Sequence, residues 1–453
     1  MNDSSAVFKA RQRRSNAVTS EGLGRVGWVA ALLMVLLATV FRGGNRGVAL
    51  MALEALALVV LLGWARRALG APGLPPALGA GRWRAARLAL AAAPLWVVAV
   101  QMLPWPGPGA LSATPQALAF AALAGLPIAA CWLLGLGASG AQLQTLLRLW
   151  LGVSVAQALL GLVQLGGAEA LQFGGLGGGV RGTYASNNSF ANLLAMATPL
   201  AVLSLWGASA RRSGQRAGRA WWGTAALLIL LSAALASSSR TGIATALLVT
   251  LLALALLAPA AERGASRWRQ RRWWLPLMAL ALLGTALYMG GLAWVDRFDA
   301  DRLVADDAVR ALTREATWQG ALAFWPLGSG LGSYAWVFPR FQSPEVGYYL
   351  LDLAHNDYLQ ILMETGVLGL AAMMLALALM GRRVLQLFRA ARGTSSWSSA
   401  DRVAVACGLG LLATLLHAWV DYPFRIPANA MLAAFLLGVF LREPAPARAR
   451  QHF

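Results

Sequence analysis

Long apolar runs, separated by short polar segments, dominate this chain. Most of the runs have about the 20 residues that a helix needs to cross a bilayer. They predict an all-α, polytopic integral membrane protein with about 12 transmembrane helices and a large external loop that carries short helices. The predicted helices lie at residues 26–41, 47–64, 86–103, 117–136, 146–165, 189–207, 222–238, 241–258, 274–294, 357–380, 403–420 and 427–441.

This pattern divides the chain into five parts. We expect a basic cytoplasmic N-terminus at 1–25, nine transmembrane helices at 26–294 and an external, periplasmic loop at 295–356. Three more transmembrane helices would follow at 357–441, and then a cytoplasmic tail at 442–453. The basic head leads into the first apolar run without a small-residue cleavage site, so no signal peptide is expected.

Composition supports the membrane assignment. Hydrophobic residues make up 58% of the chain and charged residues only 12%, whereas soluble proteins carry roughly a quarter of charged residues. Both cysteines, Cys131 and Cys407, fall inside predicted membrane helices. They are expected to be small core residues and not a disulfide or metal-binding pair.

The net charge of +20 is explained by membrane orientation. With the N-terminus in the cytoplasm, 28 of the 38 Lys and Arg residues fall in the predicted cytoplasmic segments. Such an excess marks the cytoplasmic side of a membrane protein. Both termini are therefore expected in the cytoplasm, and nucleic acid is not an expected partner.

Four polar segments fall on the opposite, external side. They are the stretch from Arg181 to Asn188, the turn SSSRTG at 237–242, the long loop that contains Arg314 and ends at His355, and HAWVDYPFRIPANA at 417–430. Scarce polar residues at the ends of membrane helices indicate where chemistry can take place.

Arg240 lies between two apolar runs, at the expected start of a helix. Its guanidinium and the free backbone N–H groups there could bind one anion, and a diphosphate suits the forked geometry of arginine. Alternatively, Arg240 reaches the lipid headgroups without binding a ligand. Arg181 follows the run GGLGGGV, which is either a flexible linker or a close approach to a ligand.

His355 is one of three histidines in the chain. Asp357 and Gln360 resemble a capping box, so His355 would precede a helix N-terminus, which disfavours a charged imidazolium. A neutral imidazole suits a general base, but a structural histidine is the alternative. Glu364 could pair with an arginine, orient His355 or make an interhelical hydrogen bond.

Two further side-chain assignments follow from spacing. Asp421 and Arg425 are close enough in sequence to pair with each other. The long loop also carries aromatic residues that either pack beneath it or stack on sugars. These residues are Trp318, Trp325, Tyr334 and Trp336.

Taken together, these segments resemble the bacterial O-antigen ligase and polymerase family. The resemblance covers most of the chain, from about residue 101 to about residue 438. Its most specific parts are the SSSRTG turn, HNDYLQILMETG at 355–366, and the stretch WQGALAFWPLGSGLGSY at 318–334.

The resemblance implies a metal-independent, inverting glycosyltransferase at the periplasmic face of the bacterial inner membrane. Its donor would be an undecaprenyl-diphosphate-linked glycan, and no cofactor would be needed. By the same resemblance His355 matches the catalytic base, and Arg240, Arg181 and Arg314 match arginines that bind the diphosphate. The motif around His355 would also supply three residues that support the base, namely Glu364, Asn356 and Tyr358.

Two activities share these motifs within the family. A polymerase joins one lipid-linked repeat to another, and a ligase joins the finished glycan to lipid A–core. The segments at 187–200 and 417–430 favour a polymerase of exopolysaccharide or O-antigen assembly. A transporter or flippase is a remote alternative, because the halves of the chain show no evident similarity and the polar motifs lie on one face.

Overall fold

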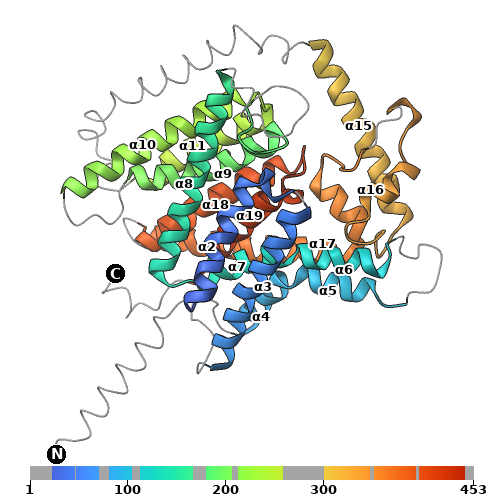
Figure 1. The fold of residues 1–453 in the computed structure, drawn as a ribbon, viewed down its shortest axis with the longest axis horizontal. Helices are drawn as coiled ribbons and strands as arrows, with labels where there is room; N and C mark the ends of the chain where they lie inside the picture. The colour runs from blue at the N-terminus through green and yellow to red at the C-terminus, as the bar shows by residue number, and fades with distance from the viewer. Residues whose placement is uncertain are drawn as a thin grey trace, which may run out of the picture.

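The computed structural model describes residues 23–45, 47–70, 81–104, 113–166, 180–206, 213–258, 300–346, 351–393 and 397–443. Over these ranges the chain forms helices joined by turns and coil, with no β-strand (Figure 1). The first part contains α2 (Arg25–Val40), η1 (Arg42–Gly44), α3 (Gly47–Gly70), α4 (Gly81–Ala91), α5 (Ala93–Gln101), α6 (Pro115–Ala124), α7 (Leu126–Gly137), α8 (Gly140–Leu165), α9 (Asn187–Leu205), α10 (Ser213–Ala236) and α11 (Arg240–Leu257). The second part contains α15 (Ala300–Ala323), α16 (Tyr334–Val337), η5 (Phe338–Arg340), η6 (Pro344–Val346), α17 (Asp357–Gly393), α18 (Ser399–His417), η7 (Pro423–Arg425) and α19 (Pro427–Phe440).

Seven stretches of these helices are long and apolar enough to cross a membrane, judged by length and composition. They are Gly47–Leu69, Pro115–Gly137, Gly140–Leu165, Asn187–Leu205, Arg240–Leu257, Asp357–Ala391 and Ser399–His417. The bent pair α4–α5 adds an eighth if it forms one span. Within the described residues, the fold therefore agrees with the expected all-α membrane protein with several spans.

Three shorter apolar helices occupy the places of further expected spans, at Arg25–Val40, Trp221–Ala236 and Pro427–Phe440. The expected ninth span, 274–294, lies outside the described residues. The count of twelve spans, and the division of the chain into five parts, therefore stay predictions.

One expected span is not straight. The apolar run at 86–103 predicts a single helix, but α4 and α5 meet at a bend of 69° beside Ala92. Pro94 lies in the first turn of α5. Proline lacks the N–H that a continuous helix needs and clashes with the preceding turn, which explains the break.

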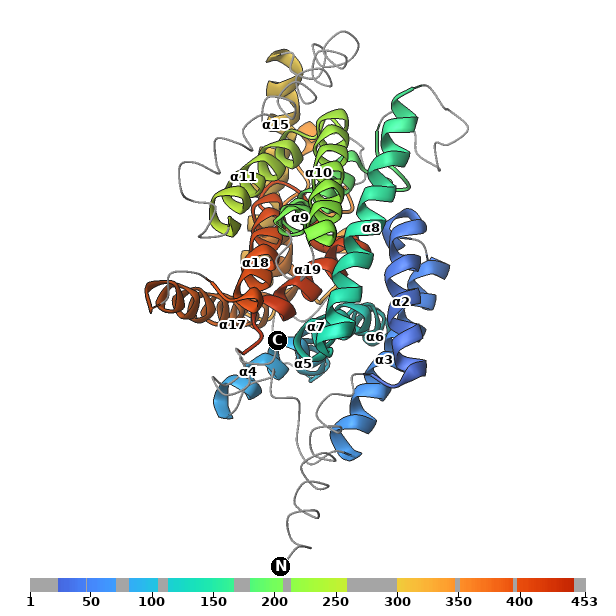
Figure 2. The ribbon, with the colours of Figure 1, turned by 90° about the vertical axis from the view of Figure 1, so that its left-hand side faces the viewer.

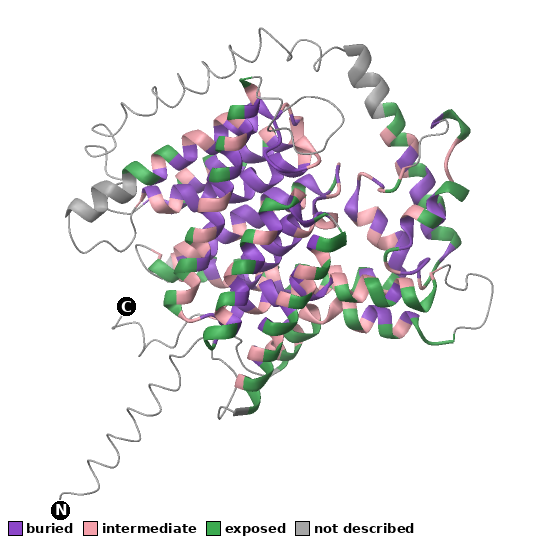
Figure 3. Ribbon diagram, viewed as in Figure 1, coloured by how far each residue is buried: buried purple, intermediate pink, exposed green. Residues whose placement is uncertain are grey.

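Helix α9 lies at the centre of the structure, in contact with α8, α10, α11, α18 and α19 (Figures 1 and 2). Its candidate span is 83% buried inside the protein, whereas those of α3 and α17 are 28% buried. Figure 3 shows the same contrast between buried central helices and the more exposed outer ones. An apolar helix that is buried all round forms the core, so α9 is the scaffold for its neighbours.

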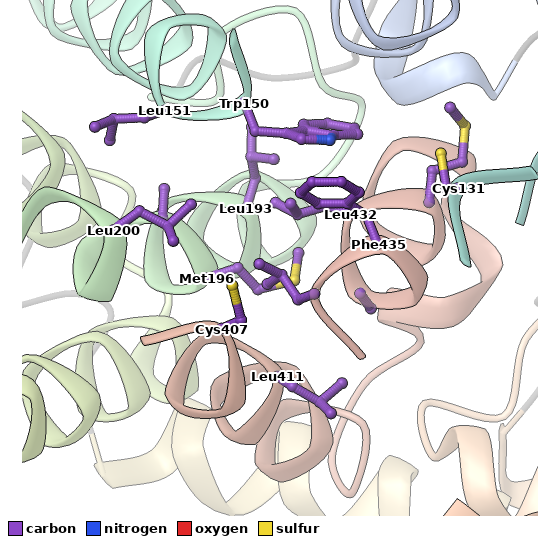
Figure 4. Close-up of a cluster of buried hydrophobic side chains, with 14 of the residues drawn as sticks. Cys131, Trp150, Leu151, Leu193, Met196, Leu200, Cys407, Leu411, Leu432 and Phe435 are labelled. Atoms are coloured by element: carbon purple, nitrogen blue, oxygen red, sulfur yellow. The ribbon is translucent and has the colours of Figure 1, made fainter. Parts of the chain in front are cut away.

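The core beside α9 is built from large apolar side chains of three helices. Trp150 of α8, Leu193 of α9 and Phe435 of α19 meet there (Figure 4). Cys131 and Cys407 are both free and buried in the same core. The expectation that the cysteines are core residues is therefore confirmed.

Helices α7 and α19 cross with their backbones in contact, because glycines replace side chains at the crossing. A Cβ on Gly135 would lie 2.3 Å from the carbonyl oxygen of Phe435. A Cβ on Gly438 would lie 2.4 Å from that of Trp132. Small residues allow membrane helices to approach this closely. The crossing holds α19 in place, and with it the preceding η7.

The long loop contains the helix that its sequence predicts. The segment at 310–324 falls largely within α15, which packs along α17 (Figure 1). The Gly-rich stretch that follows is turn and coil, as expected. A small apolar cluster around Phe338, which stacks on Tyr334 with ring centroids 4.8 Å apart, ties α16 to this unit.

Candidate active site

Helix ends from separate parts of the chain meet around His355. The N–H of Asp357, at the start of α17, donates to the carbonyl of Ala418, just after α18 (2.9 Å). The side-chain amide of Asn429 in α19 donates to the carbonyl of Ser189 in α9 (2.8 Å). These contacts bring the segment 417–430 against the starts of α9 and α17.

His355 is held against a buried carboxylate. Its Nδ1 lies 3.2 Å from Asp421 Oδ1, and its side chain is 31% exposed. The Tyr422 ring packs edge-on against the imidazole, with ring centroids 4.8 Å apart. Burial raises the pKa of Tyr422 to about 12, so this neighbour is a neutral phenol at physiological pH. The nitrogen that faces Asp421 is thus Nδ1 and not Nε2.

Asp421 lies between two histidines. Its Oδ2 is 3.6 Å from Nε2 of His417, four residues earlier in the chain, and the two side chains are 4% and 1% exposed. Burial opposes ionisation of Asp421, but its contacts with His355 and His417 outweigh burial and lower the pKa of its carboxyl well below the usual range. The carboxylate is therefore charged at neutral pH and can stabilise an imidazolium on His355.

Arg425 forms a buried ion triad with two carboxylates of α17. Its Nη1 lies 2.9 Å from Glu364 Oε2, and its Nε lies 3.5 Å from Asp357 Oδ1. The expected pairing of Arg425 with Asp421 is wrong, because Asp421 contacts the histidines. Glu364 takes one of the roles considered for it, pairing with an arginine, while Asp421 is the carboxylate that contacts His355.

The start of α17 is capped one residue earlier than the sequence suggested. The Asn356 Oδ1 accepts from the backbone N–H groups of Tyr358 and Leu359, both at 3.1 Å. The Gln360 side chain reaches back to the N–H of Ala354, also at 3.1 Å. The Tyr358 hydroxyl donates to the carbonyl of Leu415 in α18 (2.7 Å). The motif residues beside His355 therefore fix the loop and dock α17 on α18.

The Gly-rich stretch of the long loop lies directly on α17. The N–H of Gly330 donates to the Glu364 carbonyl (2.9 Å), and that of Gly332 donates to the Glu364 side chain (3.1 Å). A Cβ on Gly328 would lie 2.4 Å from the backbone of Glu364. Helix α17 is interrupted at Gly366, where φ is 54° and ψ is −133°. Glycine allows both the close approach and the break.

Arg240 is the first residue of α11, as its sequence position predicts. Ser239 caps the helix, accepting from the N–H of Gly242 (3.3 Å). The preceding Ser238 has a φ of 56°, which turns the chain sharply between α10 and α11. The Asn187 side chain donates to the carbonyl of Ser237 (3.1 Å), so this turn lies beside the start of α9.

Arg181 is 5% exposed and belongs to a turn held by α8. Its backbone N–H donates to Gln164 Oε1 (3.1 Å). The N–H of Thr183 donates to Gln157 Oε1 (2.9 Å). Gln157 and Gln164 are seven residues apart, two turns on one face of α8, so together they fix this turn. The glycine run at 174–179 that precedes Arg181 lies outside the described residues.

Residues 225–374 match the family model described as O-Antigen ligase. This match, which covers 150 of the 453 residues, supports the resemblance to the O-antigen ligase/polymerase family. No curated protein matches the chain. The matched segment runs from α10 into α17 and contains Arg240, Arg314 and His355, whereas Arg181 and Asp421 lie outside it.

The aromatic residues of the loop divide into two groups. Tyr334 is 1% exposed, and its hydroxyl lies 2.9 Å from that of Thr317, so it packs inside the loop unit. Trp318, Trp325 and Trp336 are exposed by 42%, 49% and 81%. None of these three belongs to the buried apolar cluster around Phe338.

The remaining predicted site residue, Arg314, is partly buried on α15, which lies along α17. The structure thus places Arg314 on the loop unit and Arg240 at a helix start, and it brings His355 together with the start of α17. Within the described ranges, no group of three His, Cys, Asp or Glu side chains has the arrangement of a metal site.

Sequence reasoning did not include Asp421 and Arg425 among the candidate site residues. Their partners, His355 and Glu364, are more than 60 residues away in the chain. One signal was present, since both residues lie in the polar segment that was assigned to the external side. Their pairing could not be read from it, because three different carboxylates and two histidines lie within reach of that segment.

Proposed function

We propose that this protein is a glycosyltransferase that acts on a lipid-linked glycan at the external face of the bacterial inner membrane. The donor is an undecaprenyl-diphosphate-linked glycan, and the acceptor is a sugar hydroxyl. The observation that carries the proposal is the contact between His355 Nδ1 and the buried Asp421 carboxylate (3.2 Å). A histidine oriented by a carboxylate is an arrangement that enzymes use for a general base.

In the proposed reaction, the acceptor oxygen attacks the anomeric carbon of the donor glycan. The bond from that carbon to the diphosphate oxygen breaks, and undecaprenyl diphosphate leaves with the bonding electrons. The hydroxyl proton passes to Nε2 of His355, and Asp421 stabilises the imidazolium that results. Attack opposite to the leaving group inverts the anomeric configuration. Diphosphate is already a good leaving group, so the proposed step uses no metal and no cofactor.

Three arginines are proposed to bind the diphosphate. Arg240 stands at the N-terminus of α11, where helix N–H groups and the helix dipole favour an anion. Arg181 lies in a turn that two glutamines of α8 hold in place, and Arg314 lies on α15 above α17. Arginine forks grip phosphate oxygens in pairs, which suits a group that must be held as its charge increases.

The motif around His355 supports the base without taking part in the transfer. Asn356 caps α17, and Tyr358 fastens α17 to α18. Glu364 binds the Gly-rich stretch of the loop through its side chain and its backbone carbonyl. The loop is thereby held beside the base, where it can cover the reacting groups.

Within this proposal we favour a polymerase of exopolysaccharide or O-antigen assembly, in which the acceptor is a second lipid-linked glycan. A ligase, whose acceptor is lipid A–core, is the alternative. A transporter or flippase is a remote one, because its substrate site is expected near the middle of the membrane, whereas His355 and Arg240 both lie at helix starts. Both termini are proposed to lie in the cytoplasm.

The proposal is tested by complementing a knockout strain with the wild type, His355→Ala, Arg240→Ala or Asp421→Asn. Lipopolysaccharide ladders are read on gels beside secreted polysaccharide, with protein levels checked in the membrane fraction. We expect His355→Ala to lower the rate by about 10²–10⁴-fold, the usual contribution of a general base. Arg340→Ala is the matched control, because Arg340 is an exposed arginine on η5 of the same loop.

The products distinguish the activities. Loss of polymer with single-repeat products retained supports a polymerase. Full-length glycan that accumulates on its lipid carrier, with bare lipid A–core, shows a ligase. Full complementation by both His355→Ala and Arg240→Ala, at normal protein level, would overturn the catalytic assignment.

A further inference from the structure

A second histidine shares the carboxylate that orients His355. His417, the last residue of α18, lies with Nε2 3.6 Å from Asp421 Oδ2, while His355 Nδ1 lies 3.2 Å from Oδ1. The separation on the His417 side is longer than a hydrogen bond but within the range of an ion pair. His417 is 1% exposed, so it cannot reach a substrate from this position.

The surroundings of His417 indicate which nitrogen carries its proton. Its Nδ1 is buried without a hydrogen-bond partner among the described residues. A proton on Nδ1 would have no acceptor there, whereas Nε2 is the nitrogen that lies near the Asp421 carboxylate, at 3.6 Å. The neutral tautomer with Nε2–H is therefore favoured.

We propose that His417 is a positioning residue that shares the Asp421 carboxylate with His355 and limits how strongly that carboxylate favours the imidazolium form of His355. The inference rests on the proposed function, in which His355 must be neutral in order to accept a proton. A buried carboxylate with a single partner stabilises the charged form of that partner by its full electrostatic interaction. A second histidine, 3.6 Å from the other oxygen, divides that charge between two partners.

Other charged or titratable groups lie around this cluster. Asp357 of α17 interacts electrostatically with Asp421 and pairs with Arg425 of η7 in the ion triad. Tyr422 packs on His355, and the charges of Asp352 and Arg310 interact electrostatically with Tyr422.

Of the helices packed against α18, α9 and α19 contain no titratable residue, and α11 contributes only Arg240. Helix α17 contributes Tyr358, whose hydroxyl donates to the carbonyl of Leu415 in α18. None of the surrounding groups lies in the turn at 418–420, which follows α18 and separates His417 from Asp421, so a change at His417 tests the shared carboxylate directly.

The test uses three substitutions of His417 in the full-length protein. His417→Gln keeps an N–H donor at about the reach of Nε2, His417→Leu removes the donor, and His417→Asn keeps a polar group that stops short of Asp421. Purified protein in liposomes is treated with diethyl pyrocarbonate, which modifies neutral imidazole, and the modification of His355 is followed by mass spectrometry from pH 5 to pH 9. The pH dependence of glycan formation is measured in membranes of the complemented knockout.

We expect His417→Leu and His417→Asn to move the midpoint of His355 modification, and the acidic limb of glycan formation, upward by about one pH unit. His417→Gln should keep both near the wild-type position. A purely structural role would lower activity equally at every pH. That result, a downward shift, or a Gln variant that behaves like Leu would overturn the proposal.

The two assays separate this inference from the proposed function. If the midpoint of His355 modification shifts as expected but His355→Ala still forms glycan, the shared carboxylate stands and the base assignment fails. If His355→Ala is inactive but His417→Leu leaves the midpoint unchanged, the base assignment stands and the role of His417 fails. His417→Asn keeps the test decisive if the apolar variant does not fold.

Discussion

Replacing Arg425 with methionine tests the buried ion triad that joins η7 to α17. The side chains of Asp357 and Glu364 are 0% and 1% exposed, and Arg425 is their counter-charge at 3.5 and 2.9 Å. Arg425→Met leaves two buried carboxylates close together without a cation. Removal of one partner from a buried ion pair destabilises proteins by about 3–5 kcal/mol, and we expect a loss in that range.

Two matched variants provide reference values for the expected loss of stability. Glu364→Gln leaves a pair of one carboxylate with Arg425, and its amide oxygen can still accept from Gly332, so a loss of about 1–2 kcal/mol is expected. Arg340→Met removes an exposed arginine and should change stability by less than about 0.5 kcal/mol. In the double variant Glu364→Gln/Arg425→Met, one buried carboxylate remains instead of two. Its loss should therefore be smaller than the sum of the two single losses.

The free energy of unfolding is measured by SDS titration of purified protein in mixed micelles. The expected order of losses is Arg425→Met, then Glu364→Gln, then Arg340→Met. The reasoning is refuted if Arg425→Met is as stable as Arg340→Met, or if Glu364→Gln is the most damaging change. Strict additivity in the double variant would show that the three charges do not act as one unit.

Three further outcomes are expected, each read by the same titration. Gly328→Ala should lower the free energy of unfolding by about 1–3 kcal/mol, because the added Cβ would lie 2.4 Å from the Glu364 backbone and the residue has a φ of +79°. Gly381→Ala, which has open space around it, should raise the free energy of unfolding by up to about 1 kcal/mol. Equal effects of the two would contradict the close approach. Gln157→Leu should lose about 1–3 kcal/mol by leaving the buried N–H of the Arg181 turn unpaired, and no loss would show that the turn is held by other contacts. The pKa of Asp421 is lowered in the folded state, so its ionised carboxylate stabilises the protein fully above the ordinary pKa of 3.8, and this stabilisation is lost as the pH falls below 3.8. Asp421→Asn should lack this acid-induced loss of stability. A stability difference between wild type and variant that does not change with pH would count against the lowered pKa.

Several features of the molecule could be predicted from local sequence. The apolar runs predicted helices because a chain in a bilayer must satisfy its backbone groups within each span. Arg240 was placed at a helix start from its position between two such runs, and α15 was predicted from its periodicity. The loop character of the Gly-rich stretch followed from composition.

Some local predictions failed at the level of single residues. The helix expected at 86–103 is bent, although Pro94 was visible within the run. The cap of α17 is Asn356 and not Asp357, whose carboxylate contacts Arg425 instead. The bend has a local cause in Pro94 that the apolar pattern alone did not reveal, whereas the choice of cap depended on Arg425, a partner from another part of the chain.

The sequence by itself determined that this is a helical membrane protein and where its polar motifs begin and end. It also indicated which histidine and which arginines are candidate site residues. Only the tertiary structure decided how those groups pair. Asp421 contacts His355 and His417, and Arg425 contacts Asp357 and Glu364, because α7, α9, α18 and α19 pack closely enough to bring η7 against the start of α17. A hydrophobic period specifies the face that a helix buries, but not the partner that its end meets.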